Sequence, residues 1–377
     1  MTLADLPTPA ALLDEARLDH NIATMQARAQ ALGVRLRPHV KTTKCGPVVQ
    51  RQLAAGAAGI TVSTLKEAEA FFALGVADIL YAVGIVPGKL AMVQALREQG
   101  CRLTVILDSV EAAQALVAHG QAHGQAHGHV FDVMIEIDTD GARAGLPPAS
   151  PALPAVARTL VEGGAQLKGV MTHCGASYGC RGADELAAMA EQERARCVEA
   201  ATVLRAAGHA CPEVSVGSTP TALAARHLEG VTELRAGVYA FHDLVMRGLG
   251  VCATEDIALS VLTTVIGHQR DKGWVLVDAG WMAMSRDMGA GTCGYGVVCD
   301  EAGVPLPGLL VSSANQEHGT VTRVDGVLDV TLAERLPVGT RLRVLPNHAC
   351  ATAAQFDRYA VLRAGGGLES WSRFGGW

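Results

Sequence analysis

The chain has 377 residues, of which 49% are hydrophobic and 4% aromatic, and its formal net charge at pH 7 is −6. This length allows two domains, or one barrel with an appendage, and the composition is that of a globular α/β protein. The acidic balance argues against a nucleic-acid-binding surface, and no apolar run reaches the ~18 residues that would span a bilayer.

The N-terminal segment and the cysteines favour a cytoplasmic protein. Residues 1–7 contain no positive region followed by an apolar core, so we expect no signal peptide. The ten cysteines show no repeated spacing and no CxxC pair. We therefore expect reduced thiols, without a disulfide framework or a structural zinc site built from cysteines.

The first part of the chain alternates short apolar runs with helical patterns. The expected strands cover residues 34–37, 58–63, 78–83, 103–107, 130–137, 167–172, 213–216 and 232–235. The expected helices cover residues 46–55, 65–74, a segment from Pro87, 110–119, 151–162, 183–207 and a short segment around Leu223. Eight strands in strict alternation with helices predict a parallel sheet closed into a (β/α)8 TIM-like barrel. The alternative is a doubly wound open sheet, although no GxGxxG follows the first strand, as a dinucleotide-binding domain would require.

The sequence changes character near residue 250. Segments such as 258–266, 274–277 and 341–345 are short, rich in β-branched residues and separated by turn residues, and no long helical pattern follows. Residues 6–13 are expected to join this second domain before the chain enters the barrel through a helix from Asp14. We therefore predict a barrel of residues 14–249 and a mostly β domain of residues 1–13 plus 250–377.

A low-complexity insert interrupts the barrel at residues 121–129, QAHGQAHGH. Its three histidines invite a metal-binding interpretation. The insert follows a helix and precedes a strand, which places it on the face of a barrel opposite to active sites. We interpret it as a surface loop.

Lys41 stands where the first strand gives way to a helix, within Arg37-Pro-His-Val-Lys-Thr42. A lysine at such a position can be desolvated by its surroundings, which lowers the pKa of its amine and makes it a nucleophile. Taken alone, this stretch favours an ordinary surface lysine, because most lysines are solvated surface charges.

Polar and glycine-rich residues follow several of the other strands. Residues 138–145 follow the fifth strand, His173 to Tyr178 the sixth, Gly217-Ser218-Thr219 the seventh and Gly237-Val238-Tyr239 the eighth. In a barrel these segments meet at one rim, where active sites lie.

The last two segments have the character of an anion site. Gly217-Ser218-Thr219 leads into a helix whose N–H groups can bind phosphate, and Gly237 lets a second backbone segment approach. An ordinary helix cap and turn would give the same pattern in each segment alone. Together with a strand-end lysine, they indicate a phosphorylated cofactor that forms a Schiff base, which is pyridoxal 5′-phosphate.

Five motifs, in order along the chain, resemble the alanine-racemase-like class of pyridoxal-phosphate enzymes. They are residues 37–42 (RPHVKT), 138–143 (DTDGAR), 172–173 (TH), 217–219 (GST) and 235–239 (RAGVY). Within that class the sequence is most similar to the group of D-serine dehydratases and D-threonine aldolases. Residues 61–69, 277–286 and 346–352 look closest to its members that dehydrate 3-hydroxyaspartate.

The resemblance implies roles for individual residues. It makes Lys41 the Schiff-base lysine and catalytic residue, and places Arg143 near the phenolic oxygen of the cofactor and His173 against its pyridine ring. Tyr178 becomes a candidate neighbour of the ring nitrogen. The phosphate would be held by the loops after the seventh and eighth strands, that is, by Gly217, Ser218, Thr219, Gly237, Val238 and Tyr239.

His348-Ala349-Cys350 lies in the predicted β domain. In an extended segment, residues two apart point the same way, so an imidazole and a thiolate can bind one metal ion. An HxC alone is a weak metal signal, but in the resembled group this pair is the divalent-metal site. A thiolate favours zinc or another transition ion, such as manganese or cobalt, over magnesium or calcium.

The resemblance implies a lyase that removes water and then ammonia from a 3-hydroxy D-amino acid. From 3-hydroxyaspartate the products are oxaloacetate and ammonia, and from D-serine they are pyruvate and ammonia. Cys350 favours dehydration, because aldolase members of the group tend to carry aspartate at that position. A D-threonine-type aldolase, an amino-acid racemase and a non-catalytic cofactor carrier remain alternatives, and the group is expected to form homodimers.

Overall fold

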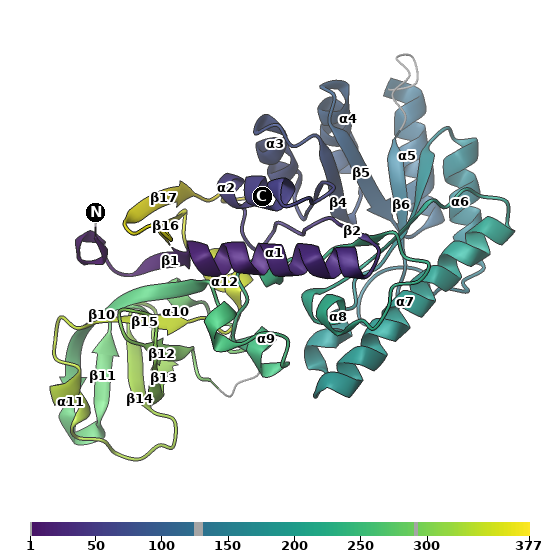
Figure 1. Cartoon of the computed structure of the whole chain (residues 1–377). Coiled ribbons are helices and arrows are strands. Elements are labelled where there is room, and N and C mark those ends of the chain that lie inside the picture. The colour runs from purple at the N-terminus through teal and green to yellow at the C-terminus, as the bar shows by residue number, and fades with distance from the viewer. Residues whose placement is uncertain (1, 124–130, 290–292) are drawn as a thin grey trace. The chain divides into compact units, whose positions relative to one another are not determined.

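The computed structural model describes residues 2–123, 131–289 and 293–377. The chain forms two compact units (Figure 1). One, here called the β unit, comprises Met1–Ile22, Thr42–Pro47 and Val238–Gly375. The other, the barrel unit, comprises Ala23–Lys41, Val48–Gly237 and Gly376–Trp377. The domain limits predicted from the sequence remain a prediction.

Eight parallel strands form the sheet of the barrel unit, in the order β2-β9-β8-β7-β6-β5-β4-β3. They are β2 (Arg35–Leu36), β3 (Ile60–Val62), β4 (Asp78–Gly84), β5 (Arg102–Leu107), β6 (Asp132–Glu136), β7 (Gln166–Met171), β8 (Glu213–Val216) and β9 (Glu233–Leu234). The segment that follows β2 meets β3 at a parallel bridge between His39 and Thr61. There the Thr61 N–H donates to the Pro38 carbonyl at 2.8 Å, and this contact joins the two outer strands.

This topology confirms the predicted parallel barrel and excludes the doubly wound open sheet, in which the first and last strands of the order would stay apart. The helices that follow the strands are α2 (Gly46–Ala54), α3 (Leu65–Ala73), α4 (Leu90–Glu98), α5 (Val110–His123), α6 (Ala152–Glu162), α7 (Ala183–Ala206) and α8 (Thr219–Ala224). Helix α5 continues to His123, so the first residues of the histidine-rich insert are helical. Residues 124–129 of the insert lie outside the described residues.

Hydrophobic patterning explains why these segments pack as they do. In α6 the buried residues are Leu153, Val156, Ala157 and Leu160. Their spacing places them on one face of the helix, as an amphipathic helix covering a sheet requires. The inside of the barrel contains a cluster of Leu80, Ile106, Met134 and Met171, one from each of four neighbouring strands. Apolar side chains thus fill the interior, and polar groups remain for its two ends.

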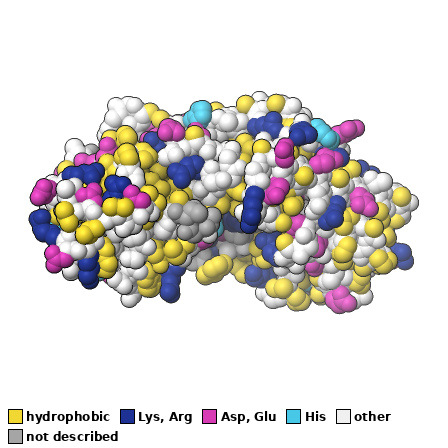
Figure 2. Space-filling model, turned by 90° about the horizontal axis from the view of Figure 1, so that it is seen from below, with side chains coloured by type: hydrophobic (Ala, Val, Ile, Leu, Met, Phe, Trp, Pro, Cys, Tyr) yellow, Lys and Arg dark blue, Asp and Glu magenta, His cyan; other side chains and the backbone are white. Residues whose placement is uncertain are grey.

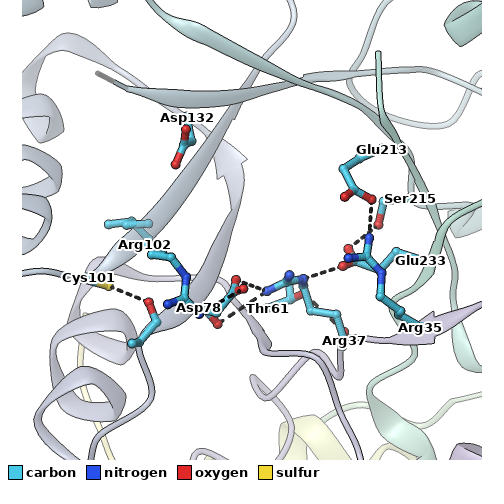
Figure 3. A network of polar contacts seen from close by, with 12 residues as sticks. Arg35, Arg37, Thr61, Asp78, Cys101, Arg102, Asp132, Glu213, Ser215 and Glu233 are labelled. Carbon is cyan, nitrogen blue, oxygen red and sulfur yellow. Dashed lines mark hydrogen bonds and ion pairs between the residues drawn. The ribbon is translucent and has the colours of Figure 1, made fainter. Parts of the chain in front are cut away.

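The amino ends of the barrel strands carry a network of ion pairs (Figure 3). The Arg37 side chain, 12% exposed, donates to Asp78 at 2.6 Å and to Glu233 at 2.7 Å. Burial lowers the pKa of Arg37, but the two carboxylates outweigh it and the net pKa is raised. Arg35 pairs with Glu213 in the same network. These groups lie at the amino ends of the strands. That end of a (β/α)8 barrel contributes to stability, whereas active sites lie at the opposite end.

The β unit is built on a nine-stranded sheet of order β11-β14-β13-β12-β15-β10-β1-β16-β17, in which an additional β10–β11 pairing closes the strands from β11 to β10 into a ring. The strands are β1 (Ala10–Asp14), β10 (Leu259–Gln269), β11 (Trp274–Val277), β12 (Val297–Cys299), β13 (Pro305–Ala314), β14 (Gly319–Arg323), β15 (Arg341–Leu345), β16 (Arg358–Leu362) and β17 (Leu368–Ser372). The helices here are short: α9 (Leu244–Gly248), α10 (Trp281–Met284), α11 (Leu332–Arg335) and α12 (Ala349–Ala353).

Strand β1, near the start of the chain, pairs with β10 and β16 of the β unit. Helix α1 (Glu15–Ala31) follows directly, as expected for a helix that starts at Asp14. On the face seen in Figure 2, acidic and basic side chains are interspersed. No helix among the described residues is long and apolar enough to cross a membrane.

Candidate functional site

The predicted site residues of the barrel unit all follow the carboxyl ends of its strands. Lys41 follows β2, Arg143 follows β6, His173 follows β7, Gly217 follows β8 and Gly237 follows β9. Because the strands are parallel and form a closed sheet, their carboxyl ends meet at one rim. The rim thus brings a lysine, an arginine, an imidazole and two glycine-containing loops to the same end of the barrel.

Lys41 is exposed at this rim. Its backbone N–H donates to the Nδ1 atom of His39 at 3.4 Å. The positive charge of Lys41 also contributes, after burial, to the lowered pKa values of His39 and His173. The amine therefore lies within electrostatic reach of two imidazoles that are neutral near pH 7.

His173 is fixed by the loop that follows the next strand. Its Nδ1 atom lies 3.2 Å from the Gly217 carbonyl oxygen, and since that oxygen can only accept, Nδ1 carries the proton. Burial, followed by the charge of Lys41, lowers the pKa of His173 to about 4. A neutral imidazole of fixed tautomer can lie flat against an aromatic ring without an unpaired buried charge.

Tyr178 and Arg143 are the more exposed members of the predicted set. The Tyr178 side chain is 40% exposed, and its ring centroid lies 6.4 Å from that of His173. The Arg143 side chain is 62% exposed and approaches only the Glu136 carboxylate, at 4.0 Å, among the ion pairs of the described residues. Both side chains are therefore exposed at the rim.

The Gly217-Ser218-Thr219 loop is a tight helix start. Gly217 has φ +132°, and a Cβ atom there would lie 2.8 Å from the Arg235 nitrogen, so only glycine fits. Ser218 caps α8: its hydroxyl accepts from the Thr221 N–H at 3.3 Å and lies 3.0 Å from the Ser177 hydroxyl. The loop is therefore ordered by its own hydrogen bonds, and Thr219 is buried within it.

Gly237 also allows a close backbone approach, because a Cβ atom there would lie 2.8 Å from the His39 carbonyl oxygen. The next two predicted phosphate residues, Val238 and Tyr239, are buried in a 3₁₀ turn that belongs to the β unit.

The predicted metal ligands lie at the start of α12 in the β unit. A side-chain hydrogen bond to Cys350 is the largest cause of a raised pKa of His348, about 10, and the Asp287 carboxylate contributes. The His348 Nδ1 atom lies 2.6 Å from Asp287 Oδ2. The Cys350 sulfur lies 3.0 Å from the hydroxyl of Thr42, and the Asp243 carboxylate accepts from the Ala349 N–H between the two ligands at 2.9 Å.

The residues present fit both groups that the sequence implies. At the rim, Lys41, Arg143 and Arg235 all act on His173 as positive charges, which suits an anionic cofactor. In the β unit, an imidazole and a thiol two residues apart at the start of α12, with a carboxylate on the Nδ1 atom of the imidazole, suit a transition-metal ion. Among the described residues, no three His, Cys, Asp or Glu side chains form a closed metal-binding group. A two-ligand centre leaves positions open for water and substrate.

Several residues around these centres were not anticipated from the sequence. Asp287 and Thr42 contact the predicted metal ligands from distant parts of the chain, and Glu193 lies beneath the two loops at the rim. Only Thr42 carried a signal, since it directly follows Lys41 and belongs to the same motif.

Comparison with known proteins places these features in a family. The model of the alanine racemase N-terminal domain matches residues 13–244, and that of a putative serine dehydratase domain matches residues 258–362. D-threo-3-hydroxyaspartate dehydratase of Delftia sp. (strain HT23) is 59% identical over 381 residues, covering 100% of this chain and 99% of that protein. D-serine dehydratase of Dictyostelium discoideum is 30% identical, covering 95% and 94%.

A solved structure of D-threo-3-hydroxyaspartate dehydratase, a cysteine-to-alanine variant in its metal-free form, superimposes with a TM-score of 0.97 at 58% identity, covering 100% of both chains. The chain belongs to the alanine-racemase-like family of pyridoxal-phosphate enzymes, in the branch that carries a serine dehydratase domain. The predicted family and fold are confirmed. The relatives are named as dehydratases, which are carbon–nitrogen lyases, and this confirms the predicted enzyme class.

Proposed function

We propose that this chain is a pyridoxal-phosphate- and divalent-metal-dependent dehydratase of 3-hydroxy D-amino acids. Its preferred substrate is D-threo-3-hydroxyaspartate, which it converts to oxaloacetate and ammonia, and D-serine is a secondary substrate that gives pyruvate. The placement of His348 and Cys350 two residues apart at the start of α12, with Asp287 2.6 Å from the His348 ring, carries the proposal, in a chain 59% identical to D-threo-3-hydroxyaspartate dehydratase. An amino-acid racemase needs no such metal-binding pair.

The barrel rim would hold the cofactor. Lys41 would bond to its aldehyde carbon, His173 would lie against its ring, and Arg143 would approach its phenolic oxygen. Tyr178 would neighbour the ring nitrogen, and Gly217, Ser218, Thr219, Gly237, Val238 and Tyr239 would hold the phosphate. When bound, pyridoxal phosphate supplies an electron sink that acidifies the proton on the substrate's Cα.

Lys41 would have a second role besides holding the cofactor. Its free amine would take the proton from the substrate's Cα as general base. His173 stays neutral during this step, because burial and the neighbouring positive charges lower its pKa to about 4. Lys41 is therefore the only group at the rim to which we assign movement of a proton.

His348 and Cys350 would hold a divalent ion, with zinc, manganese or cobalt as candidates. The ion supplies a Lewis acid for the substrate's β-hydroxyl, which is otherwise a poor leaving group. Asp287 fixes the orientation of the His348 ring through Nδ1. A relative's cysteine variant is described as metal-free, which supports a cysteine as metal ligand in this branch.

Product analysis tests this function. The holoenzyme, supplied with zinc or manganese, is incubated with each diastereomer of 3-hydroxyaspartate, with D- and L-serine and with D-threonine, and ammonia, keto acid, glycine and enantiomer are measured. We expect equal amounts of ammonia and keto acid, fastest from D-threo-3-hydroxyaspartate. Glycine with an aldehyde would indicate an aldolase, and an enantiomer without ammonia a racemase, and either result rejects the proposal. The homodimer and the cytoplasmic location remain predictions, open to sedimentation and cell fractionation.

A further inference from the structure

Helix α7 holds the loops that follow three successive strands of the barrel. It connects β7 to β8, and three of its side chains, Gln192, Glu193 and Arg196, contact the carboxyl-end loops. Residues 192, 193 and 196 lie on one side of a helix, because residues three and four apart are neighbours on its surface. We call these three residues the α7 brace.

Glu193 occupies the centre of the brace. Its Oε1 atom accepts the backbone N–H of Cys174 and that of Gly217, both at 3.1 Å. The first N–H belongs to the loop after β7, directly after His173, and the second to the loop after β8. One carboxylate oxygen therefore fixes the separation of two loops that carry proposed cofactor contacts.

The other two members of the brace hold the loop after β6. The Gln192 side-chain amide donates to the Thr139 carbonyl at 2.8 Å, and the Arg196 guanidinium donates to the same oxygen at 2.7 Å. Thr139 precedes Arg143, and its hydroxyl lies 2.8 Å from that of Thr172, next to His173. The brace therefore positions the backbones that carry Arg143 and His173.

The surroundings of Glu193 suit a positioning role and not an acid–base role. The residue is 2% exposed, and it points at backbone donors and at Thr221 rather than at open space. Burial raises the pKa of its carboxyl group, opposed by hydrogen bonds from Thr221, Cys174 and Gly217. A buried acceptor that satisfies two backbone N–H groups is costly to remove, since both donors then stay unpaired.

We propose that the α7 brace sets the relative positions of the three cofactor-contacting loops and that Glu193 is its central positioning residue. This inference rests on the proposed function, in that the rim binds pyridoxal phosphate. Under this proposal, cofactor affinity depends on Glu193, a residue of α7 that does not itself contact the cofactor.

The test measures cofactor binding, independently of turnover. Pyridoxal phosphate is titrated into cofactor-free protein, and its dissociation constant and the visible circular dichroism of the bound cofactor are recorded. For Glu193→Ala we expect the dissociation constant to rise at least about tenfold, with an altered spectrum, because two loop donors lose their acceptor. Glu193→Gln should stay within about threefold of wild type, since the amide oxygen accepts both N–H groups and its nitrogen can donate to Thr221.

Arg194→Gln is the matched control. Arg194 is the next residue on α7, but it donates to Glu191 on the same helix and to the Glu229 carbonyl in the loop before β9, away from the rim. The dissociation constant of pyridoxal phosphate from the Arg194→Gln variant should remain within about threefold of the wild-type value. If Glu193→Ala does not fold, Arg196→Met provides a milder variant that loses one bond to Thr139, and a changed spectrum of the bound cofactor is expected.

Three results would overturn the brace. The first is that Glu193→Ala binds the cofactor with the dissociation constant and spectrum of wild type. If Glu193→Ala does not fold, the same result in Arg196→Met counts. Equal losses in Glu193→Gln and Glu193→Ala would show that charge rather than hydrogen-bond geometry is required. Equal losses in Arg194→Gln would show that any weakening of α7 suffices. If wild type itself binds no pyridoxal phosphate, the proposed function fails, and the brace with it.

Discussion

The side-chain hydroxyl of Thr42 lies 3.0 Å from the sulfur of Cys350, 308 residues away along the chain. Thr42 is 1% exposed, and a peptide bond joins it to Lys41. Successive Cα atoms across a trans peptide are about 3.8 Å apart, so covalent geometry ties the proposed cofactor lysine to a residue that contacts a proposed metal ligand. Thr42 is therefore expected to influence the metal centre, although it is not a ligand.

The Thr42→Val variant tests this expectation. Valine has the size of threonine but no hydroxyl, so the cysteine sulfur loses its polar neighbour while the backbone can stay in place. We expect the zinc dissociation constant to rise about tenfold, as is typical when a group that orients a ligand is removed. Competition with a chromophoric chelator measures it. Thr43→Val, at the next position along the chain, is the control, and the backbone carbonyl that accepts from the Tyr359 hydroxyl is kept in it. Wild-type zinc affinity in a folded Thr42→Val protein would refute the role.

Lys41→Ala should lose the visible absorbance of the covalently held cofactor and all release of ammonia. Lys89 also follows a barrel strand, β4, but its amine donates to the Tyr81 hydroxyl at 2.9 Å, so we do not expect it to replace Lys41. Borohydride reduction of wild type, followed by peptide mass analysis, should find the cofactor on Lys41. Lys66→Ala, an exposed lysine on α3, is the control. A Lys41→Ala protein that keeps both absorbance and turnover would exclude the assigned role.

His242 is expected to make stability depend on pH. Burial lowers its pKa from 6.5 to about 4 in the folded state. Between these values the unfolded chain binds more protons, so the free energy of unfolding should fall as pH falls from 6.5 to 4. The difference corresponds to at most about 3 kcal/mol for this histidine.

Urea unfolding of wild type and His242→Asn at several pH values between 4 and 7 measures this contribution. Asparagine tolerates the φ of +50° found at this position, so the backbone need not change. Below pH 6.5, the free energy of unfolding of the variant should fall less steeply than that of wild type, because the variant lacks the buried histidine. Parallel curves for the two proteins would contradict the prediction.

Arg37→Met should destabilise the barrel without weakening cofactor binding. Glu233, whose side chain is 5% exposed, would keep a buried charge without its closest cation (Figure 3). Removing one partner of a buried ion pair costs about 3–5 kcal/mol, whereas replacing both with apolar groups of similar size is often neutral. The free energy of unfolding should therefore fall for Arg37→Met and recover in Arg37→Met/Glu233→Met. No change in the single variant would show that the pair contributes nothing.

The fold was largely predictable because its strands are apolar runs bounded by turn residues. The strands β5 and β8 match the predicted segments within one residue, whereas β2 and β9 are only two residues each. The predicted segments around those two strands are longer than the strands, because the apolar pattern continues past the last hydrogen-bonded pair. The spacing of apolar residues alone does not show where hydrogen bonding between strands stops. The closing His39–Thr61 bridge is likewise a tertiary contact with no local signal.

The site was predictable only where a residue belongs to a local motif. Lys41, Gly217 and His348 stand in recognisable stretches, and the structure places each at a strand end or a helix start. Glu193 sits in a helix rich in charged residues, where nothing in the spacing separates it from its solvated neighbours. Asp287 approaches His348 from 61 residues away, and such pairings depend on the packing of the whole unit.

The most direct test of the account measures ammonia release and cofactor absorbance together, before and after metal removal. Holoenzyme is treated with a chelator, dialysed and assayed with D-threo-3-hydroxyaspartate. We predict that ammonia release falls to background while the absorbance of the bound cofactor persists, and that zinc or manganese restores turnover. Ammonia release that continues at the untreated rate in protein shown to be metal-free would contradict the proposed metal-dependent dehydration.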